Sequence, residues 1–214
     1  MVRVKICGLT NKESAWAAVE AGADAIGFVF AEGRRRITPV LAREIIRSLP
    51  PYITTTGVFV NEELNQVNQI ADFCRLDLLQ LHGDETPEYC NRAVRPVVKT
   101  IHMGAGVPDD EYIQNRYGER VRAFLLDTFV AGATGGTGQT FPWSSVQKMR
   151  IRTPIILAGG LHPVNVAEAI RLTQPFSVDV SSGVETNGQK DPAKMREFVH
   201  AVRSCSPVFF GDPH

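Results

Sequence analysis

The chain has 214 residues, 43% of them hydrophobic, so it can bury one substantial core and lies near the lower size limit of an α/β barrel. Lys plus Arg and Asp plus Glu both number 23, so the overall charge favours neither nucleic acid, nor an anionic membrane surface, nor an acidic partner. The charged residues near Met1 exclude a signal-peptide core, and no later apolar run approaches the length of a membrane span. We therefore expect a cytoplasmic protein that binds a small molecule.

The chain alternates between short apolar, β-branched runs and helical patterns. The predicted strands are 2–7, 25–30, 54–60, 78–81, 97–101, 123–127, 155–158 and 177–180. The predicted helices are 12–21, 39–49, 62–74, 87–94, 109–115, 143–149, 163–171 and 192–204, several of which open with proline. The Gly- and Thr-rich segment 131–140 is predicted to be a mobile loop.

Eight strands joined by crossover helices form a parallel sheet, and eight such units can close without leaving an edge. The sequence therefore predicts an α/β fold, a single-domain (β/α)8 TIM barrel over residues 1–205 with a C-terminal tail at 206–214. A doubly wound open sheet is the alternative fold.

Four cysteines lie far apart in the chain and make no zinc-ligand spacing with the five histidines. We expect neither disulfide bonds nor a structural metal. Cys7 differs from the other three because it ends the first predicted strand, where a barrel presents its functional side chains. Taken alone, a cysteine is more often a small buried hydrophobe than a catalyst.

Polar residues lie at or just after the ends of other strands. Asp127 follows four apolar residues, so it is either a functional acid or an N-cap or turn residue. Asp179 lies inside the last strand, where a structural network and contact with a substrate hydroxyl are equally reasonable. His82 follows the fourth strand. The cluster at Arg34, Arg35 and Arg36 follows the second and suits an anionic carboxylate, although a solvated turn is the alternative.

Small residues follow both of the last two strands. Gly159 and Gly160 come after the seventh strand, and Ser181, Ser182 and Gly183 come after the eighth. Loops at these two places commonly bind phosphate through backbone N–H groups. Together they predict a phosphate site.

Several motifs, in chain order, carry a family resemblance: Lys5-Ile6-Cys7-Gly8, Gln80-Leu81-His82-Gly83, Leu126-Asp127-Thr128, Ala158-Gly159-Gly160-Leu161 and Asp179-Val180-Ser181-Ser182-Gly183-Val184-Glu185. Through nearly the whole barrel the chain resembles the phosphoribosylanthranilate isomerase family. The resemblance implies an Amadori rearrangement of N-(5'-phosphoribosyl)anthranilate in tryptophan biosynthesis, without cofactor or metal. It makes Cys7 the general base and Asp127 the general acid, with the phosphate on Gly160 and 181–183. Asp179 would steady the sugar hydroxyls or the catalytic groups, and His82 would line the mouth.

The chain departs from the family pattern over residues 31–38, where it looks one residue shorter. Alignment back from Ile37 makes Arg35 the binder of the anthranilate carboxylate, with Arg36 as the alternative. The rival functions are another phosphate-binding barrel, such as indoleglycerol-phosphate synthase or the histidine-pathway isomerase, and a non-catalytic sugar-phosphate binder. Whether the protein is a monomer or a homodimer stays open.

Overall fold

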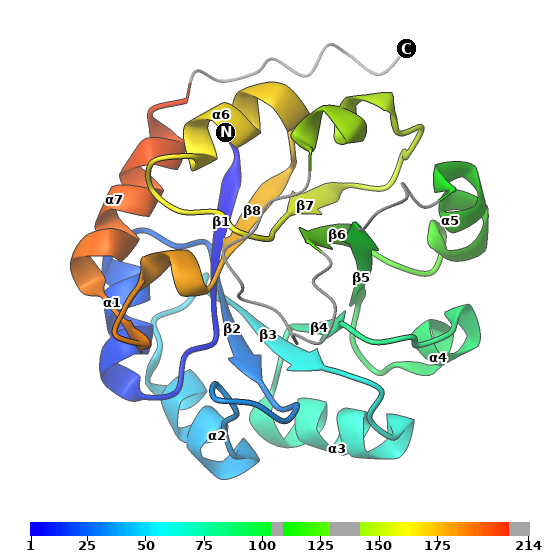
Figure 1. The fold of residues 1–214 in the computed structure, drawn as a ribbon. Helices are drawn as coiled ribbons and strands as arrows, with labels where there is room; N and C mark the ends of the chain where they lie inside the picture. The colour runs from blue at the N-terminus through cyan, green and yellow to red at the C-terminus, as the bar shows by residue number, and fades with distance from the viewer. Residues whose placement is uncertain (104–108, 129–141, 206–214) are drawn as a thin grey trace.

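The computed structural model describes residues 1–103, 109–128 and 142–205. Eight parallel strands pair in chain order, and β1 pairs with β8 to close the barrel that Figure 1 shows. The strands are β1 (Arg3–Cys7), β2 (Ala25–Val29), β3 (Thr54–Phe59), β4 (Leu78–Leu81), β5 (Val97–Met103), β6 (Ala123–Thr128), β7 (Ile155–Leu157) and β8 (Ser177–Val180). The predicted closed barrel is confirmed.

The helices form a ring outside the strands (Figure 1). They are α1 (Lys12–Glu20), α2 (Pro39–Ser48), α3 (Leu64–Cys74), α4 (Pro87–Arg92), α5 (Asp110–Tyr117), α6 (Val166–Thr173) and α7 (Pro192–Arg203). Proline opens α2, α4 and α7, and the side chains of five capping residues accept a first-turn N–H: Asn11, Thr38, Thr86, Asp109 and Asp191. In the described part of the chain, no helix is long and apolar enough to cross a membrane.

The connection between β6 and β7 differs from the prediction. The α-helix expected over 143–149 is the 3-10 helix η1 (Trp143–Lys148). Trp143 and Val146 within it and Met149 directly after it are three apart, and this spacing puts them on one side of a helix with three residues per turn. The predicted loop 131–140 and the tail 206–214 lie outside the described residues.

A second difference lies after β8. The chain makes the short 3-10 helix η2 (Ser182–Val184) and then a two-stranded hairpin of β9 (Glu185–Thr186) and β10 (Gln189–Lys190), neither of which was predicted. Lys190 pairs with Glu185 in the hairpin register, and their side chains form an ion pair at 3.0 Å. The hairpin therefore places a cation and a carboxylate beside the end of β8.

The barrel has an apolar core between its strands and helices, and both apolar and polar side chains inside the ring of strands. The main core packs the outer faces of the strands against the helices, while a separate cluster of Val98, Ala123, Leu125, Ile156 and Ala158 comes from β5, β6 and the β7 end. Buried polar side chains come from β1, β3, β4, β5 and β8: Lys5, Thr56, Gln80, Thr100 and Asp179. Because side chains alternate along a strand, Lys5 and Cys7 share the inner face of β1. The same alternation puts Gln80 and His82 on one face at the end of β4.

Candidate active site

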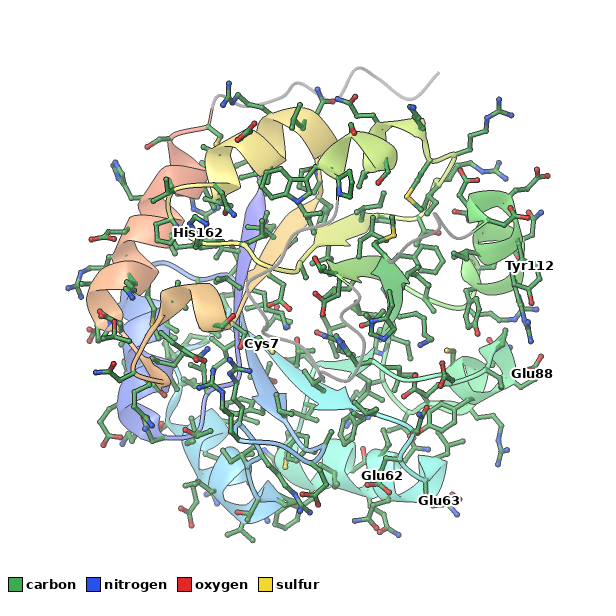
Figure 2. All side chains as sticks on the ribbon, in the orientation of Figure 1. Cys7, Glu62, Glu63, Glu88, Tyr112 and His162 are labelled. Atoms are coloured by element: carbon green, nitrogen blue, oxygen red, sulfur yellow. The ribbon has the colours of Figure 1, made fainter. Side chains whose placement is uncertain are left out.

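The side chains predicted to be functional gather at the carboxyl ends of the strands, where Figure 2 shows Cys7 near the barrel axis. Cys7 ends β1, His82 directly follows β4, and Asp127 is the last residue but one of β6. By contrast, the labelled Tyr112 and Glu88 lie on the outer helices (Figure 2). One mouth of the barrel thus holds a thiol, an imidazole and a carboxyl group.

Space for the Cys7 thiol comes from the neighbouring strand. Position 27 of β2 is a glycine, and a Cβ there would lie 2.7 Å from the Cys7 sulfur and 3.2 Å from Cε of Lys5. Burial raises the pKa of the Cys7 thiol, whereas the positive charges of Lys5 and Lys190 act in the opposite direction. The thiol therefore lies in a tight, buried place where the charges of two lysines favour its ionised form.

Lys5 and Asp179 form a buried ion pair beneath Cys7. Nζ of Lys5 donates to Oδ2 of Asp179 at 2.9 Å, and both side chains are almost fully buried. Burial alone would lower the pKa of Lys5, but the negative charges of Asp179 and the Cys7 thiolate outweigh it and raise that pKa. Oδ1 of Asp179 is buried without a hydrogen-bond partner among the described residues.

Asp127 lies beside His82. Nε2 of His82 is 3.3 Å from Oδ2 of Asp127, and Oδ1 of Asp127 accepts the N–H of Thr128 at 2.8 Å. Gly159 leaves room for this carboxyl: its φ is +79°, and a Cβ there would lie 2.8 Å from Oδ1 of Asp127. The carboxyl group is thus oriented from two sides and keeps a small exposed surface.

The arginine cluster divides its side chains between two carboxylates. Nε and Nη2 of Arg35 donate to the two oxygens of Glu185 at 2.7 and 3.2 Å, and Arg34 also pairs with Glu185. Arg36 is exposed and pairs with the exposed Glu32. Arg35 is thus mostly buried against the loop after β8, whereas Arg36 lies on the exposed surface. The choice of Arg35 as the carboxylate binder stays a prediction.

The loops after β7 and β8 lie against each other. Gly159 and Gly160 both have positive φ, +79° and +66°, and Gly183 packs on the carbonyl oxygen of Leu161. Ser181 contacts the first strand instead, since its hydroxyl donates to the carbonyl oxygen of Cys7 at 3.1 Å. Ser182 opens η2. The two loops that were predicted to bind phosphate therefore form one continuous backbone surface.

Three polar residues of this region were not singled out from the sequence. Lys5, Gln80 and Glu185 are buried or nearly so, and each bonds to a predicted site residue or to its neighbour. For Lys5 and Gln80 the available signal is strand alternation, which puts each two residues before a predicted site residue on the same face. In the described residues no cluster of three or more His, Cys, Asp and Glu side chains could hold a metal ion.

Comparison with known proteins agrees with this geometry. Residues 4–201 match the family model described as N-(5'phosphoribosyl)anthranilate (PRA) isomerase. The chain belongs to this family. An N-(5'-phosphoribosyl)anthranilate isomerase from Desulforudis audaxviator (strain MP104C) is 50% identical over 206 residues, which are 96% of this chain and 100% of the relative.

Solved structures of phosphoribosyl anthranilate isomerases are similar over the same length. One from Thermotoga maritima is 41% identical with a TM-score of 0.84, and the alignment covers 95% of this chain and 99% of that one. Another is in complex with reduced 1-(o-carboxyphenylamino)-1-deoxyribulose 5-phosphate. It is 39% identical with a TM-score of 0.80 and the same coverage. The phosphoribosylanthranilate isomerase family predicted from the motifs is confirmed.

Proposed function

We propose that the protein isomerises N-(5'-phosphoribosyl)anthranilate to 1-(2-carboxyphenylamino)-1-deoxyribulose 5-phosphate, with Cys7 as general base and Asp127 as general acid. One observation carries the assignment of roles: the Cys7 thiol and the Asp127 carboxyl group lie at the same barrel mouth. Each lies beside a glycine, Gly27 or Gly159, at which a larger side chain would collide with it. The related isomerase that holds a reduced form of the product supports the substrate class.

In this mechanism, the Asp127 carboxyl gives its proton to the ring oxygen of the ribose as the C1'–O bond breaks. The ring opens to a Schiff base, whose positive nitrogen makes the C2' proton acidic. Cys7, as thiolate, then takes that proton and leaves an enolamine, which tautomerises to the ketone product. Because Asp127 must start protonated and Cys7 must start ionised, the two groups need opposite surroundings.

The residues around Cys7 supply part of that difference. Burial of the thiol raises its pKa, so ionisation depends on the cations of Lys5 and Lys190, which oppose this effect. Asp127, in contrast, contacts the imidazole of His82, whose Nε2 lies 3.3 Å from its Oδ2. We therefore propose that the positive charge of Lys5 favours the thiolate form of Cys7.

Three further contacts would hold the substrate. Arg35 uses Nε and one proton of Nη2 for Glu185, which leaves the fork of Nη1 and Nη2 for the anthranilate carboxylate. The backbone at Gly160 and at 182–183 would bind the phosphate, and the unpartnered Oδ1 of Asp179 would accept a ribose hydroxyl. No metal or cofactor has a step in this scheme.

The test is turnover of freshly made phosphoribosylanthranilate, followed by the loss of anthranilate fluorescence. We expect Cys7→Ala and Asp127→Asn each to lower kcat by about 10²–10⁴-fold, the contribution of a positioned acid or base. Cys90→Ala, which removes another buried thiol from α4, is the matched control and should keep normal turnover. Near-normal kcat in Cys7→Ala with intact folding would assign the base to another residue.

A further inference from the structure

A row of polar contacts joins the two sides of the proposed site. Nζ of Lys5 donates to Oε1 of Gln80 at 2.9 Å, and Nε2 of Gln80 lies 3.1 Å from Nδ1 of His82. Nε2 of His82 in turn lies 3.3 Å from Asp127. Gln80 is the middle member of this row and is 3% exposed, so its amide group exchanges no hydrogen bonds with bulk water.

The amide of Gln80 can take only one orientation here. An ammonium group has donors and no acceptor, so the atom of Gln80 that faces Lys5 must be the carbonyl oxygen. The opposite orientation would put an NH₂ group against the NH₃⁺ group and leave a buried oxygen away from the cation. The Lys5–Asp179 ion pair fixes the position of that cation. Oε1 of Gln80 is therefore directed to Lys5, and the NH₂ group to His82.

This orientation determines where His82 carries its proton. Because the NH₂ group of Gln80 is a donor, Nδ1 of His82 must be the acceptor, and a neutral imidazole then has its single proton on Nε2. The hydroxyl of Thr100, 3.0 Å from Nδ1, can donate as well and is compatible with the same state. An imidazolium would place an N–H group against the NH₂ group, so Gln80 also disfavours the charged ring.

We infer that Gln80 is a positioning residue, which holds His82 as the neutral Nε2–H tautomer so that this N–H faces Oδ2 of Asp127. The inference rests on the proposed role of Asp127 as the acid. A neutral donor orients the carboxyl group, whereas a cation at the same place would favour its ionised form and hold back the proton it must deliver. Among the described residues, the other ionisable groups in contact with His82 are His102, in edge contact with its ring, and Lys99, bonded to the backbone on either side of it.

The tautomer can be measured directly by long-range ¹H–¹⁵N NMR correlation on protein labelled with [¹⁵N]histidine, since protonated and bare ring nitrogens have well separated shifts. His82→Asn identifies the signals of His82 among those of the five histidines. We expect the wild-type ring to carry its proton on Nε2. In Gln80→Glu the carboxylate accepts from both neighbours, so His82 should gain a proton on Nδ1, and kcat should fall about tenfold or more as the proposed acid loses its neutral donor.

Two further variants complete the design. Gln80→Met keeps the length of the side chain but removes both hydrogen bonds, and it should leave a mixture of tautomers set by Thr100. This variant tests the inference if the buried glutamate prevents folding. Gln69→Glu makes the same chemical change on the exposed face of α3 and should alter neither the His82 signals nor kcat.

A wild-type proton on Nδ1 would overturn the inference, and so would unchanged His82 signals in both Gln80 variants. If the His82 proton moves in a Gln80 variant but kcat stays within twofold of wild type, Gln80 has no role in the reaction. Failure of the proposed function is seen separately, as absence of wild-type turnover, because the NMR measurement needs no substrate.

Discussion

Replacement of Glu185 by glutamine tests how the barrel mouth is held together. The Glu185 side chain is 5% exposed and pairs with three cations: Arg34, Arg35 and Lys190. Although burial opposes it, the hydrogen bonds and charges of Arg35 and Lys190 lower the pKa of Glu185 to about 2. Glutamine has nearly the same shape and cannot ionise, so Glu185→Gln removes the charge and leaves the packing intact.

The size of the effect follows from the lowered pKa. The pKa of Glu185 is 4.5 in the unfolded chain and about 2 in the folded protein. Because folding favours the ionised carboxylate by this difference, the carboxylate contributes about 3 kcal/mol to the free energy of unfolding. Since the folded pKa is the lower one, this contribution is fully present above pH 4.5 and is lost as the pH falls toward 2. At pH 3 about half of it remains.

The assay is urea unfolding of wild type and Glu185→Gln at pH 7 and pH 3. We expect the variant to be less stable by about 3 kcal/mol at pH 7 and by about half as much at pH 3. Glu32→Gln, which removes the exposed partner of Arg36, should cause no measurable change at either pH. Equal losses at both pH values, or a loss under about 1 kcal/mol at pH 7, would refute the reasoning from charge.

Three further predictions concern the site. Arg35→Ala should weaken binding of a product analogue by about 1.5–3 kcal/mol, Arg35→Lys should restore part of it, and Arg36→Ala should bind normally; a reversed result would exchange the two arginines. Gly27→Ala should lower kcat by up to about 10²-fold with little change in KM, because its Cβ would lie 2.7 Å from the Cys7 sulfur; unchanged kcat would show that the sulfur can move freely. Alkylation of Cys7 by iodoacetamide can be followed by peptide mass spectrometry, and its rate should keep rising with pH to above 9. Lys5→Met should move this rise in rate to higher pH, because the cation favours the thiolate. An unchanged pH profile would show that Lys5 does not activate the thiol.

The sequence was sufficient to predict the barrel because each unit has its own physical signal. Runs such as 123–126 are apolar throughout, as strands covered on both faces must be, and proline or a capping residue marks most helix starts. The exceptions are short. Trp143–Lys148 has an apolar repeat too brief to separate one helix type from another, and the β9–β10 hairpin has two residues per strand. The tail at 206–214, the cytoplasmic location and the oligomeric state stay predictions.

The candidate site was predicted where a reactive residue ends a strand, as Cys7 and Asp127 do. Its supporting residues were missed because the sequence does not show which distant residue a polar side chain inside an apolar strand will contact. Gln80 and Lys5 are 75 residues apart in the chain, and only closure of the barrel brings them together. Arg35 and Glu185 are 150 apart and meet through the unpredicted hairpin.

The proposed acid and base both depend on the single ammonium group of Lys5. Two of its protons donate to Oδ2 of Asp179 and Oε1 of Gln80, and its positive charge favours the Cys7 thiolate. The contact with Asp179 holds the cation in place, and the contact with Gln80 sets the amide that, in our inference, keeps the proton of His82 on the side of Asp127. An arginine would not reproduce this compact arrangement, because its planar fork directs donors in one plane. In the proposed mechanism, a lysine at this place therefore links the ionisation of Cys7 to the orientation of Asp127 across the barrel mouth.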